Sequence, residues 1–213
     1  FFESLEKSFI KNIIREDRWK LLLSGFKVTI ALSILSGLFG TILGAIICFL
    51  RMRKNPILFG IADVYIKIFR GVPIVVLLLV LNYLVFTSAS FPAFWVCVIG
   101  FSLDFSAYTS EMFRNGIEAV PAGQSRAAKA MGFTQVHGFR KVVLPQALIH
   151  ILPVYTGQFI ALVKLTSVAG YISVMDLTRA SDIIRSRTYE AFFPLILTAI
   201  IYFTLSVILI DIL

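Results

Sequence analysis

Long stretches without a formal charge constrain the fold of this chain more than any other feature of its sequence. No Asp, Glu, Lys or Arg occurs in Val28–Leu50, Gly71–Leu103 or Ala191–Ile210. The stretch Gln146–Met175 is interrupted only by Lys164. A helix crosses the bilayer core in about 20 apolar residues. A buried helix of a large soluble protein is the alternative, but apolar windows of this length indicate membrane helices.

The composition agrees with a membrane protein. Hydrophobic residues make up 58% of the chain and charged residues 15%, against about a quarter in soluble domains. Turn signals and charges divide the apolar sequence into spans. We therefore expect an all-α integral membrane protein with five transmembrane helices in a single domain over residues 21–213. The predicted spans cover about residues 21–50, 59–86, 91–114, 145–169 and 191–213.

Two features refine this outline. Residues 1–20 mix charges with apolar residues at roughly helical spacing, which predicts an amphipathic segment at the membrane interface; a frayed tail is the alternative. In the first span, Ser36, Gly40 and Gly44 are four residues apart. Small residues at this spacing let helix backbones approach closely, although glycine is also tolerated generally in membrane helices.

The net charge of +8 does not indicate nucleic-acid binding, because the basic residues sit in short clusters beside apolar spans. Arg51, Arg53 and Lys54 follow the first span directly. Placing the loop after this span in the cytoplasm agrees with the positive-inside rule. It also puts residues 118–145 in the cytoplasm, although the excess of basic residues on that side is small. Cys48 and Cys97 lie inside apolar spans and are expected to be small core residues.

The polar segment 118–145 is unusually elaborate for a connection between membrane helices. Gln124–Met131 is rich in Ala and should be helical. Gly132 is suited to ending that helix, and Thr134 to capping another. A helix built into a cytoplasmic loop suggests a docking surface for a soluble partner; a loop lying on the membrane is the alternative.

The sequence shows no catalytic machinery of its own. It contains no GxxxxGK[ST] phosphate loop and no nucleophile–base arrangement in a plausible context. His137 and His150 are isolated, and we expect no metal site. The chain is therefore not expected to be an enzyme, and energy for any driven process would enter from a partner.

Charges within the apolar spans are the remaining functional candidates, since they are costly unless paired or facing a cavity. Lys164, followed by Thr166 and Ser167, could line a hydrophilic pathway with Asp104 and Glu111 as partners. Alternatively, Lys164 extends to an interface and Glu111 lies at the headgroups.

The second span has a potential break of its own. The sequence Arg70-Gly71-Val72-Pro73 could interrupt the helix and expose backbone polar groups to a cavity. The alternative is a helix that begins at Val72.

Six motifs occur in order along nearly the whole chain: Phe69–Pro73, Ser106–Ile117, Gly123–Ala128 with Gly132, Val143–Ala147, Leu162–Ser167 and Asp176–Ala180. Together they resemble the polar amino-acid permeases of bacterial ATP-binding-cassette importers. Phe69–Pro73 resembles their Phe-Arg-Gly-Thr-Pro segment, and Ser106–Ile117 the stretch before their cytoplasmic loop. The EAA loop motif of the family is matched by Gly123–Ala128 with Gly132. Matches further along the chain are Val143–Ala147, Leu162–Ser167 and Asp176–Ala180.

The chain departs from the family pattern at two positions. Arg126 stands where the EAA motif has Glu, and Leu165 stands where a Lys-Asp-Thr-Ser pattern has Asp. The first departure implies a different contact with the ATPase partner. The second implies that Lys164 is less neutralised than is usual.

The resemblance implies a five-span permease of the bacterial inner membrane, with its N-terminus outside. Its implied partners are cytoplasmic ATP-binding subunits that carry ATP and Mg²⁺, a second identical or sister permease, an extracytoplasmic solute-binding protein and membrane lipid. No cofactor is expected on this chain itself. The implied ATPase-coupling residues are Gly123, Gln124, Arg126, Ala127, Ala128 and Gly132. The implied substrate-pathway residues are Arg70, Asp104, Tyr108, Glu111, Lys164, Thr166 and Ser167.

The sequence leaves three rival functions open. The permease could import another small solute through the same machinery. The chain could instead be an ion channel or carrier that works without ATP, or a membrane scaffold that transports nothing.

Overall fold

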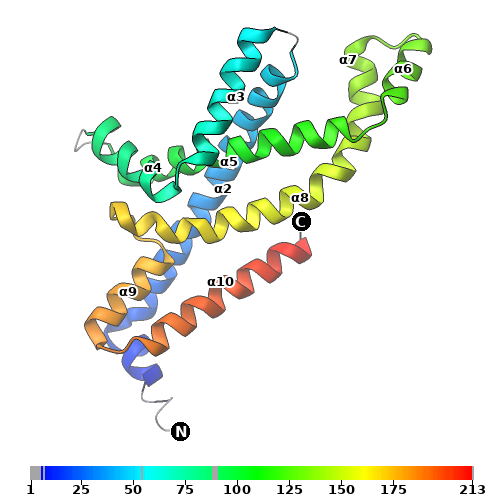
Figure 1. Ribbon diagram of the computed structural model, residues 1–213. Helices are drawn as coiled ribbons and strands as arrows, with labels where there is room; N and C mark the ends of the chain where they lie inside the picture. Colours follow the sequence, from blue (N-terminus) through cyan, green and yellow to red (C-terminus); the bar gives the residue numbers. More distant parts are fainter. Residues whose placement is uncertain (1–5, 7, 54, 88–90, 213) are drawn as a thin grey trace. The chain divides into compact units, whose positions relative to one another are not determined.

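The structure, a computed structural model, describes residues 6, 8–53, 55–87 and 91–212. Its regular elements in this part of the chain are all helical (Figure 1), which confirms the all-α prediction. The longer helices are α2 (Arg18–Arg51), α3 (Pro56–Gly71), α4 (Ile74–Val80), α5 (Ala93–Glu118), α6 (Ala122–Ala130), α8 (Leu144–Leu165), α9 (Leu177–Thr188) and α10 (Phe192–Ile212). The short elements are η1 (Ile10–Ile14), η2 (Arg15–Asp17), η3 (Leu81–Val85), α7 (Gln135–Gly138), η4 (Phe139–Val143) and η5 (Thr166–Ile172).

Among the described residues, four helical stretches are long and apolar enough to cross a membrane, or five if one bent pair counts as a single span. The four stretches are Ile10–Arg51, Ala93–Glu118, Gln135–Ile172 and Phe192–Ile212. They coincide with four of the five spans that the sequence predicts. The membrane helices are therefore confirmed, with four to five candidate spans.

The bent pair is the predicted second span. α3 ends at Gly71, and the next helical stretch, Ile74–Val85, leaves it at an angle of 105°. Pro73 causes the break, since its ring disfavours helical backbone at the preceding residue, and Val72 is extended. The predicted interruption at residues 70–73 is thus confirmed, and a helix beginning at Val72 is excluded.

The chain divides into two compact units. Unit 1 comprises Phe1–Ser36, Pro73–Phe101 and Ile160–Leu213, and unit 2 comprises Gly37–Val72 and Ser102–Phe159. The helices α2, α5 and α8 contribute residues to both units.

In unit 1, the start of α9 is fixed against α2. Leu177 donates its backbone N–H to Thr29 Oγ1 over 3.1 Å. Asp176 caps α9 by accepting backbone N–H bonds from Thr178 and Arg179. Burial raises the pKa of the Asp176 carboxyl, against these bonds, which lower it. The apolar core beneath consists of Ile13, Leu22, Leu177, Ala180 and Ile184.

In unit 2, α2 approaches α5 closely at two glycines. A Cβ added to Gly40 would lie 3.0 Å from the Ser102 carbonyl oxygen, and one added to Gly44 would lie 2.9 Å from Thr109 Cβ. Only glycine allows backbones to come this near. The tight interface predicted from the small-residue spacing is confirmed at these two positions. On another side of α2, Ile47 packs with the α3 side chains of Ala62 and Ile66.

The N-terminal segment differs from a simple amphipathic helix. It forms η1 and η2, and Glu16 and Asp17 have positive φ angles, so the chain kinks before α2. Lys11 and Asn12 donate hydrogen bonds to the Glu190 carboxylate, which lower its pKa. Part of this segment, residues 1–5 and 7, lies outside the described residues, and its place at the membrane interface stays a prediction.

The contact between α2 and α9 can be tested at Gly25. A Cβ at this position would lie 2.6 Å from the Asp176 carbonyl oxygen, a backbone atom that cannot move aside alone. We expect Gly25→Ala to lower the free energy of unfolding by about 1–3 kcal/mol, measured by thermal unfolding in detergent. Gly60, which has no atom within 4 Å of an added Cβ, provides the matched control. Equal stability of Gly25→Ala and Gly60→Ala would contradict this contact.

Candidate functional site

The predicted pathway residues fall into two groups, one in each compact unit. Unit 2 contains Arg70, Asp104, Tyr108 and Glu111, whereas unit 1 contains Lys164, Thr166 and Ser167. The two groups are therefore described separately, and the predicted pairing of Lys164 with Asp104 or Glu111 stays a prediction.

In unit 2, the polar side chains form one stripe on α5. Asp104, Tyr108 and Glu111 are four and three residues apart, a spacing that places them on the same helix face. Arg70, at the end of α3, extends over this stripe, with its guanidinium carbon 5.0 Å from the centre of the Tyr108 ring. This cation–π contact brings the two helices together at the point where α3 breaks.

Asp104 has the strongest features of a binding residue in this stripe. The residue is only 8% exposed, and no hydrogen bond or ion pair from the described residues reaches its carboxylate. A carboxylate in an apolar helix is costly unless it is paired or faces a cavity. Asp104 therefore has the capacity to bind a positively charged group.

Tyr65, which sequence reasoning missed, links α3 to α5 beside this stripe. Its hydroxyl group lies 2.6 Å from Ser106 Oγ and 3.3 Å from the Leu103 carbonyl oxygen. Its ring packs against that of Phe69 at 4.6 Å. A tyrosine in an apolar helix gives no sequence signal for such a bond, because its partner lies on another helix.

Glu111, in contrast, forms ion pairs with two arginines. It forms an ion pair with Arg51 at the end of α2, and Arg114 Nη2 lies 3.1 Å from its Oε2 atom. Arg51 also reaches Asp63 of α3 at 3.2 Å. The side chains of Arg51 and Glu111 are 16% and 17% exposed, so water screens this pair little. We call this the ion-pair cluster; its members are Arg51, Asp63, Lys67, Glu111, Arg114 and Glu118.

The ion-pair cluster joins the end of α2 to the middle of α3 and to the last two turns of α5. Its centre, Arg51, was expected from the sequence only as a basic residue beside the membrane. The charge of Glu111 is compensated within the protein, so the cluster supports a structural role. A pathway role for Glu111 stays a prediction.

In unit 1, the three predicted residues differ in accessibility. Lys164 is exposed, Ser167 is half-buried and Thr166 is fully buried. The Thr166 hydroxyl donates to the Val163 carbonyl oxygen in the last turn of α8 over 2.7 Å. Lys164 is therefore the residue of this group that is open to a ligand.

The segment between α5 and α8 folds as the sequence predicts. The predicted helix at residues 124–131 is α6, which ends one residue earlier. Gly132 follows with a φ of +83°, and the Phe133 N–H returns to the Ala128 carbonyl oxygen over 3.1 Å. This is a left-handed glycine termination. Thr134 then caps α7 by accepting a bond from the His137 N–H, which confirms the predicted cap.

We call residues Ala122–Val143, which form α6, α7 and η4, the α6–η4 loop. α6 and α7 pack closely where Ala128 meets Gly138, since a Cβ on Gly138 would lie 3.2 Å from Ala128 Cβ. Ala128 is 1% exposed, so its side chain is part of the packed interior of the loop. The other predicted coupling residues are all exposed: Gly123, Gln124, Arg126, Ala127 and Gly132.

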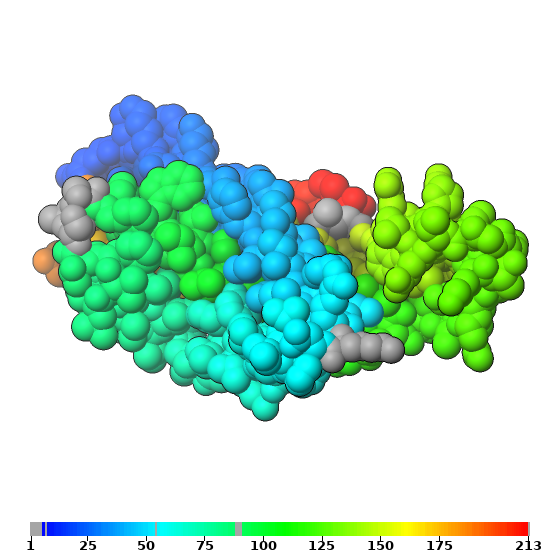
Figure 2. All heavy atoms as spheres, turned by 90° about the horizontal axis from the view of Figure 1, so that it is seen from above, coloured from blue at the N-terminus to red at the C-terminus, as the bar shows by residue number. Residues whose placement is uncertain are grey.

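The α6–η4 loop is anchored to the long helices at its base. Val120, Val143, Ala147 and Ile151 form a buried cluster against apolar residues of α5. Within unit 2, α6 and α7 stand side by side beyond the ends of α5 and α8 (Figure 1). In the space-filling view their yellow-green surface is open to solvent (Figure 2). The loop thus presents a rigid surface that is connected to α5 and α8.

In the part of the chain that the structure describes, no three His, Cys, Asp or Glu side chains gather as metal ligands would. The candidate sites of this protein are the polar stripe on α5, exposed Lys164 and the α6–η4 loop.

Comparison with known proteins gives consistent matches. The family described as "Binding-protein-dependent transport system inner membrane component" matches residues 13–213. The chain is 37% identical to the L-cystine transport system permease protein TcyB of Bacillus subtilis, over 84% of this chain and 77% of that protein. It is 34% identical to the octopine transport system permease protein OccM of Rhizobium radiobacter, over 79% of this chain and 73% of that protein.

A solved structure agrees with these relatives. The crystal structure of an amino acid ABC transporter with histidines contains a chain that is 36% identical to this one. The two superpose with a TM-score of 0.82 over 90% of each chain.

The contribution of the ion-pair cluster to the free energy of unfolding can be tested by substitution. Glu111→Gln leaves Arg51 without one of its partners in a poorly hydrated place, so we expect a loss of about 1–3 kcal/mol in the free energy of unfolding. Glu118, the exposed partner of Arg114, is the matched control, and Glu118→Gln should cost less than about 1 kcal/mol. Thermal unfolding in detergent measures both. An equal effect of the two substitutions would contradict a stabilising role for the poorly exposed Arg51–Glu111 pair.

Proposed function

The chain belongs to the family of binding-protein-dependent transport system inner membrane components, and from this premise we propose that it imports polar or charged amino acids with energy from ATP. It is a membrane permease subunit of an ABC transporter of the bacterial inner membrane. We infer the substrate class, amino acids, from the 36% identity, over 90% of the chain, to a chain of an amino acid transporter.

The proposed subunit has five spans, with α3, α4 and η3 forming one broken span. Its N-terminus is outside and the α6–η4 loop is in the cytoplasm. Two ATP-binding subunits, which hold ATP and Mg²⁺, engage two such permeases, identical or sister. An extracytoplasmic binding protein delivers the solute. The loop's folded, exposed form supports a docked cytoplasmic partner.

In the proposed mechanism, the ATP-binding subunits move the α6–η4 loop when they close on ATP. The buried cluster of Val120, Val143, Ala147 and Ile151 would pass this motion to α5 and α8. A partner shifts a conformational equilibrium only if it contacts the two states differently. A loop with a packed interior and a buried base can transmit the movement of the partner to α5 and α8, because the loop itself deforms little.

We further propose that the polar stripe on α5 contributes to the amino-acid pathway. The free carboxylate of Asp104 is suited to an ammonium group, and Arg70 over Tyr108 to a carboxylate. A zwitterionic amino acid carries both groups. Exposed Lys164, with Ser167 and Thr166 beside it, is proposed as a second polar position in unit 1.

A carrier or channel that works without ATP is the principal rival. The test is uptake into vesicles that contain the full chain with the permease, ATP-binding and solute-binding proteins of its own transporter. We expect uptake of radiolabelled amino acids only when ATP is supplied on the side of the ATP-binding subunits. Equal uptake without ATP would favour the carrier, and ATP-driven uptake of other solutes alone would overturn the amino-acid assignment.

Asp104 provides a residue-level prediction. Asp104→Asn removes the proposed partner of the substrate ammonium group, so we expect the KM for uptake to rise about tenfold or more, as for loss of one charged hydrogen bond. Asp104→Glu should restore part of the affinity. Asp182→Asn, at an exposed carboxylate of α9, is the control. Unchanged uptake by Asp104→Asn would remove this residue from the pathway.

A further inference from the structure

The α6–η4 loop carries an unbalanced positive charge. No Asp or Glu occurs between Glu118 and Asp176. Within the loop, four basic side chains are exposed: Arg126, Lys129, Arg140 and Lys141. None of them makes a hydrogen bond or ion pair with another described residue. Elsewhere in unit 2, by contrast, basic side chains such as Arg51 and Arg114 are paired with carboxylates.

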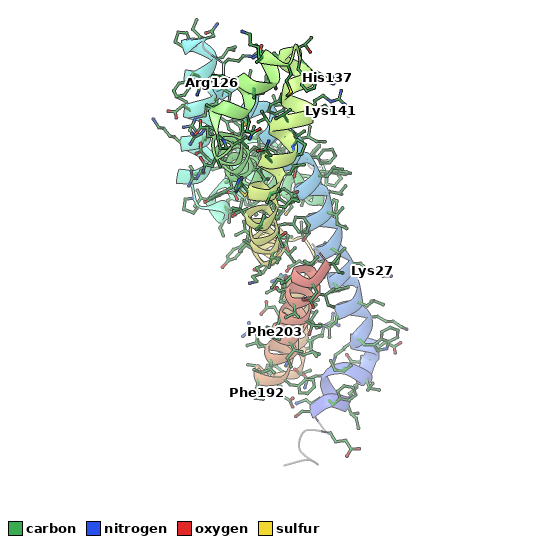
Figure 3. The ribbon with its side chains drawn as sticks, turned by 90° about the vertical axis from the view of Figure 1, so that its right-hand side faces the viewer. Lys27, Arg126, His137, Lys141, Phe192 and Phe203 are labelled. Atoms are coloured by element: carbon green, nitrogen blue, oxygen red, sulfur yellow. The ribbon has the colours of Figure 1, made fainter. Side chains whose placement is uncertain are left out.

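The basic residues are held in a fixed arrangement. Arg126 and Lys129 are three residues apart on α6, and Arg140 and Lys141 are three and four residues after His137, so each set shares a helix face. Figure 3 shows Arg126, His137 and Lys141 at the same end of unit 2. The loop's internal packing and caps keep these charges together before any partner binds.

Exposed apolar side chains lie among these charges. Met131 is 66% exposed and Val136 69% exposed, and Phe133 and Phe139 are partly accessible. The preference for basic residues in cytoplasmic loops accounts for the charges but not for this apolar surface. A mixture of Met, aromatic and Arg side chains is typical of protein–protein interfaces.

The composition of α6 separates a protein partner from a membrane surface. A helix lying on a bilayer needs a face of large apolar residues. α6 has the sequence Ala-Gly-Gln-Ser-Arg-Ala-Ala-Lys-Ala, in which no apolar side chain is larger than Ala. Small residues suit a helix that is seated in a groove of another protein.

We propose that the α6–η4 loop binds an acidic groove on the ATP-binding subunit, with the permease contributing the positive side of the contact. This inference rests on the proposed function, which supplies the identity of the partner. It goes further by assigning the charge of the partner's groove. Arg126, in the middle of α6, is the central positive charge of this contact.

Electrostatic recognition has a measurable signature. Salt screens exposed charges over about 8 Å at physiological ionic strength, so charge-dependent binding weakens as salt increases. The test uses the full chain in nanodiscs of phosphatidylcholine, a lipid without net charge, and the ATP-binding subunit of its own transporter. Biolayer interferometry measures the Kd between them.

We expect the Kd to rise about tenfold or more between about 50 mM and about 300 mM NaCl. Arg126→Glu, and the double variant Arg140→Glu/Lys141→Glu, should each weaken binding about tenfold or more at low salt. They should also flatten the dependence on salt. The matched control is Arg185→Glu/Arg187→Glu, at exposed basic positions of α9, which should leave the Kd unchanged. Circular dichroism and thermal unfolding verify that each variant is folded.

The other outcomes separate this inference from the proposed function. Tight binding that ignores salt and charge reversal would overturn the acidic groove and leave the ATP-binding partner in place. No binding by the wild-type chain would overturn the proposed function and this inference with it. Salt dependence that appears only in nanodiscs with anionic lipid would show that the basic residues serve the membrane, and would also overturn the proposal.

Discussion

The close approach of α2 and α5 is the constraint on which unit 2 depends. Gly40 and Gly44 allow it, because a larger side chain would overlap with α5. A Cβ on Gly40 would lie 3.0 Å from the Ser102 carbonyl oxygen, and one on Gly44 would lie 2.9 Å from Thr109 Cβ. In a bilayer, lipid chains are as apolar as the side chains, so helices associate by close packing of small residues and by polar contacts. Once these helices are in contact, Arg51 at the end of α2 can reach Glu111 on α5. The ion-pair cluster is thus a consequence of the glycine contact.

The same contact determines where the two candidate sites lie. α5 carries the polar stripe of Asp104, Tyr108 and Glu111 from its middle toward its C-terminal end, shortly before the α6–η4 loop. A buried apolar cluster joins the base of this loop to α5 and α8. One helix therefore connects a proposed solute-binding position with a proposed energy-coupling surface. A permease needs such a connection, because the two sites must change state together.

The sequence predicted the elements better than the contacts. Apolar windows located the spans to within a few residues, Pro73 located the break, and Gly132 and Thr134 located the ends of the loop helices. These signals are local, and each has a backbone cause. The bond from Tyr65 to Ser106, the reach of Arg51 to Glu111 and the internal role of Ala128 were missed, because they depend on neighbours that are distant in sequence. The sequence shows that Arg126 is unusual. Only the structure shows that the basic residues of the loop, Arg126, Lys129, Arg140 and Lys141, are all exposed and unpaired within the part of the chain that it describes.

We propose that the α6–η4 loop is the site at which ATP drives this permease. Cysteine crosslinking in the assembled, actively transporting complex tests this role of the loop. The probe is Ser125→Cys, on the exposed side of α6, in a chain whose buried Cys48 and Cys97 are replaced by alanine. We expect a crosslink from this position to the ATP-binding subunit and none from Ser186→Cys on α9. A complex that transports solute with ATP but gives no crosslink from Ser125→Cys would contradict it.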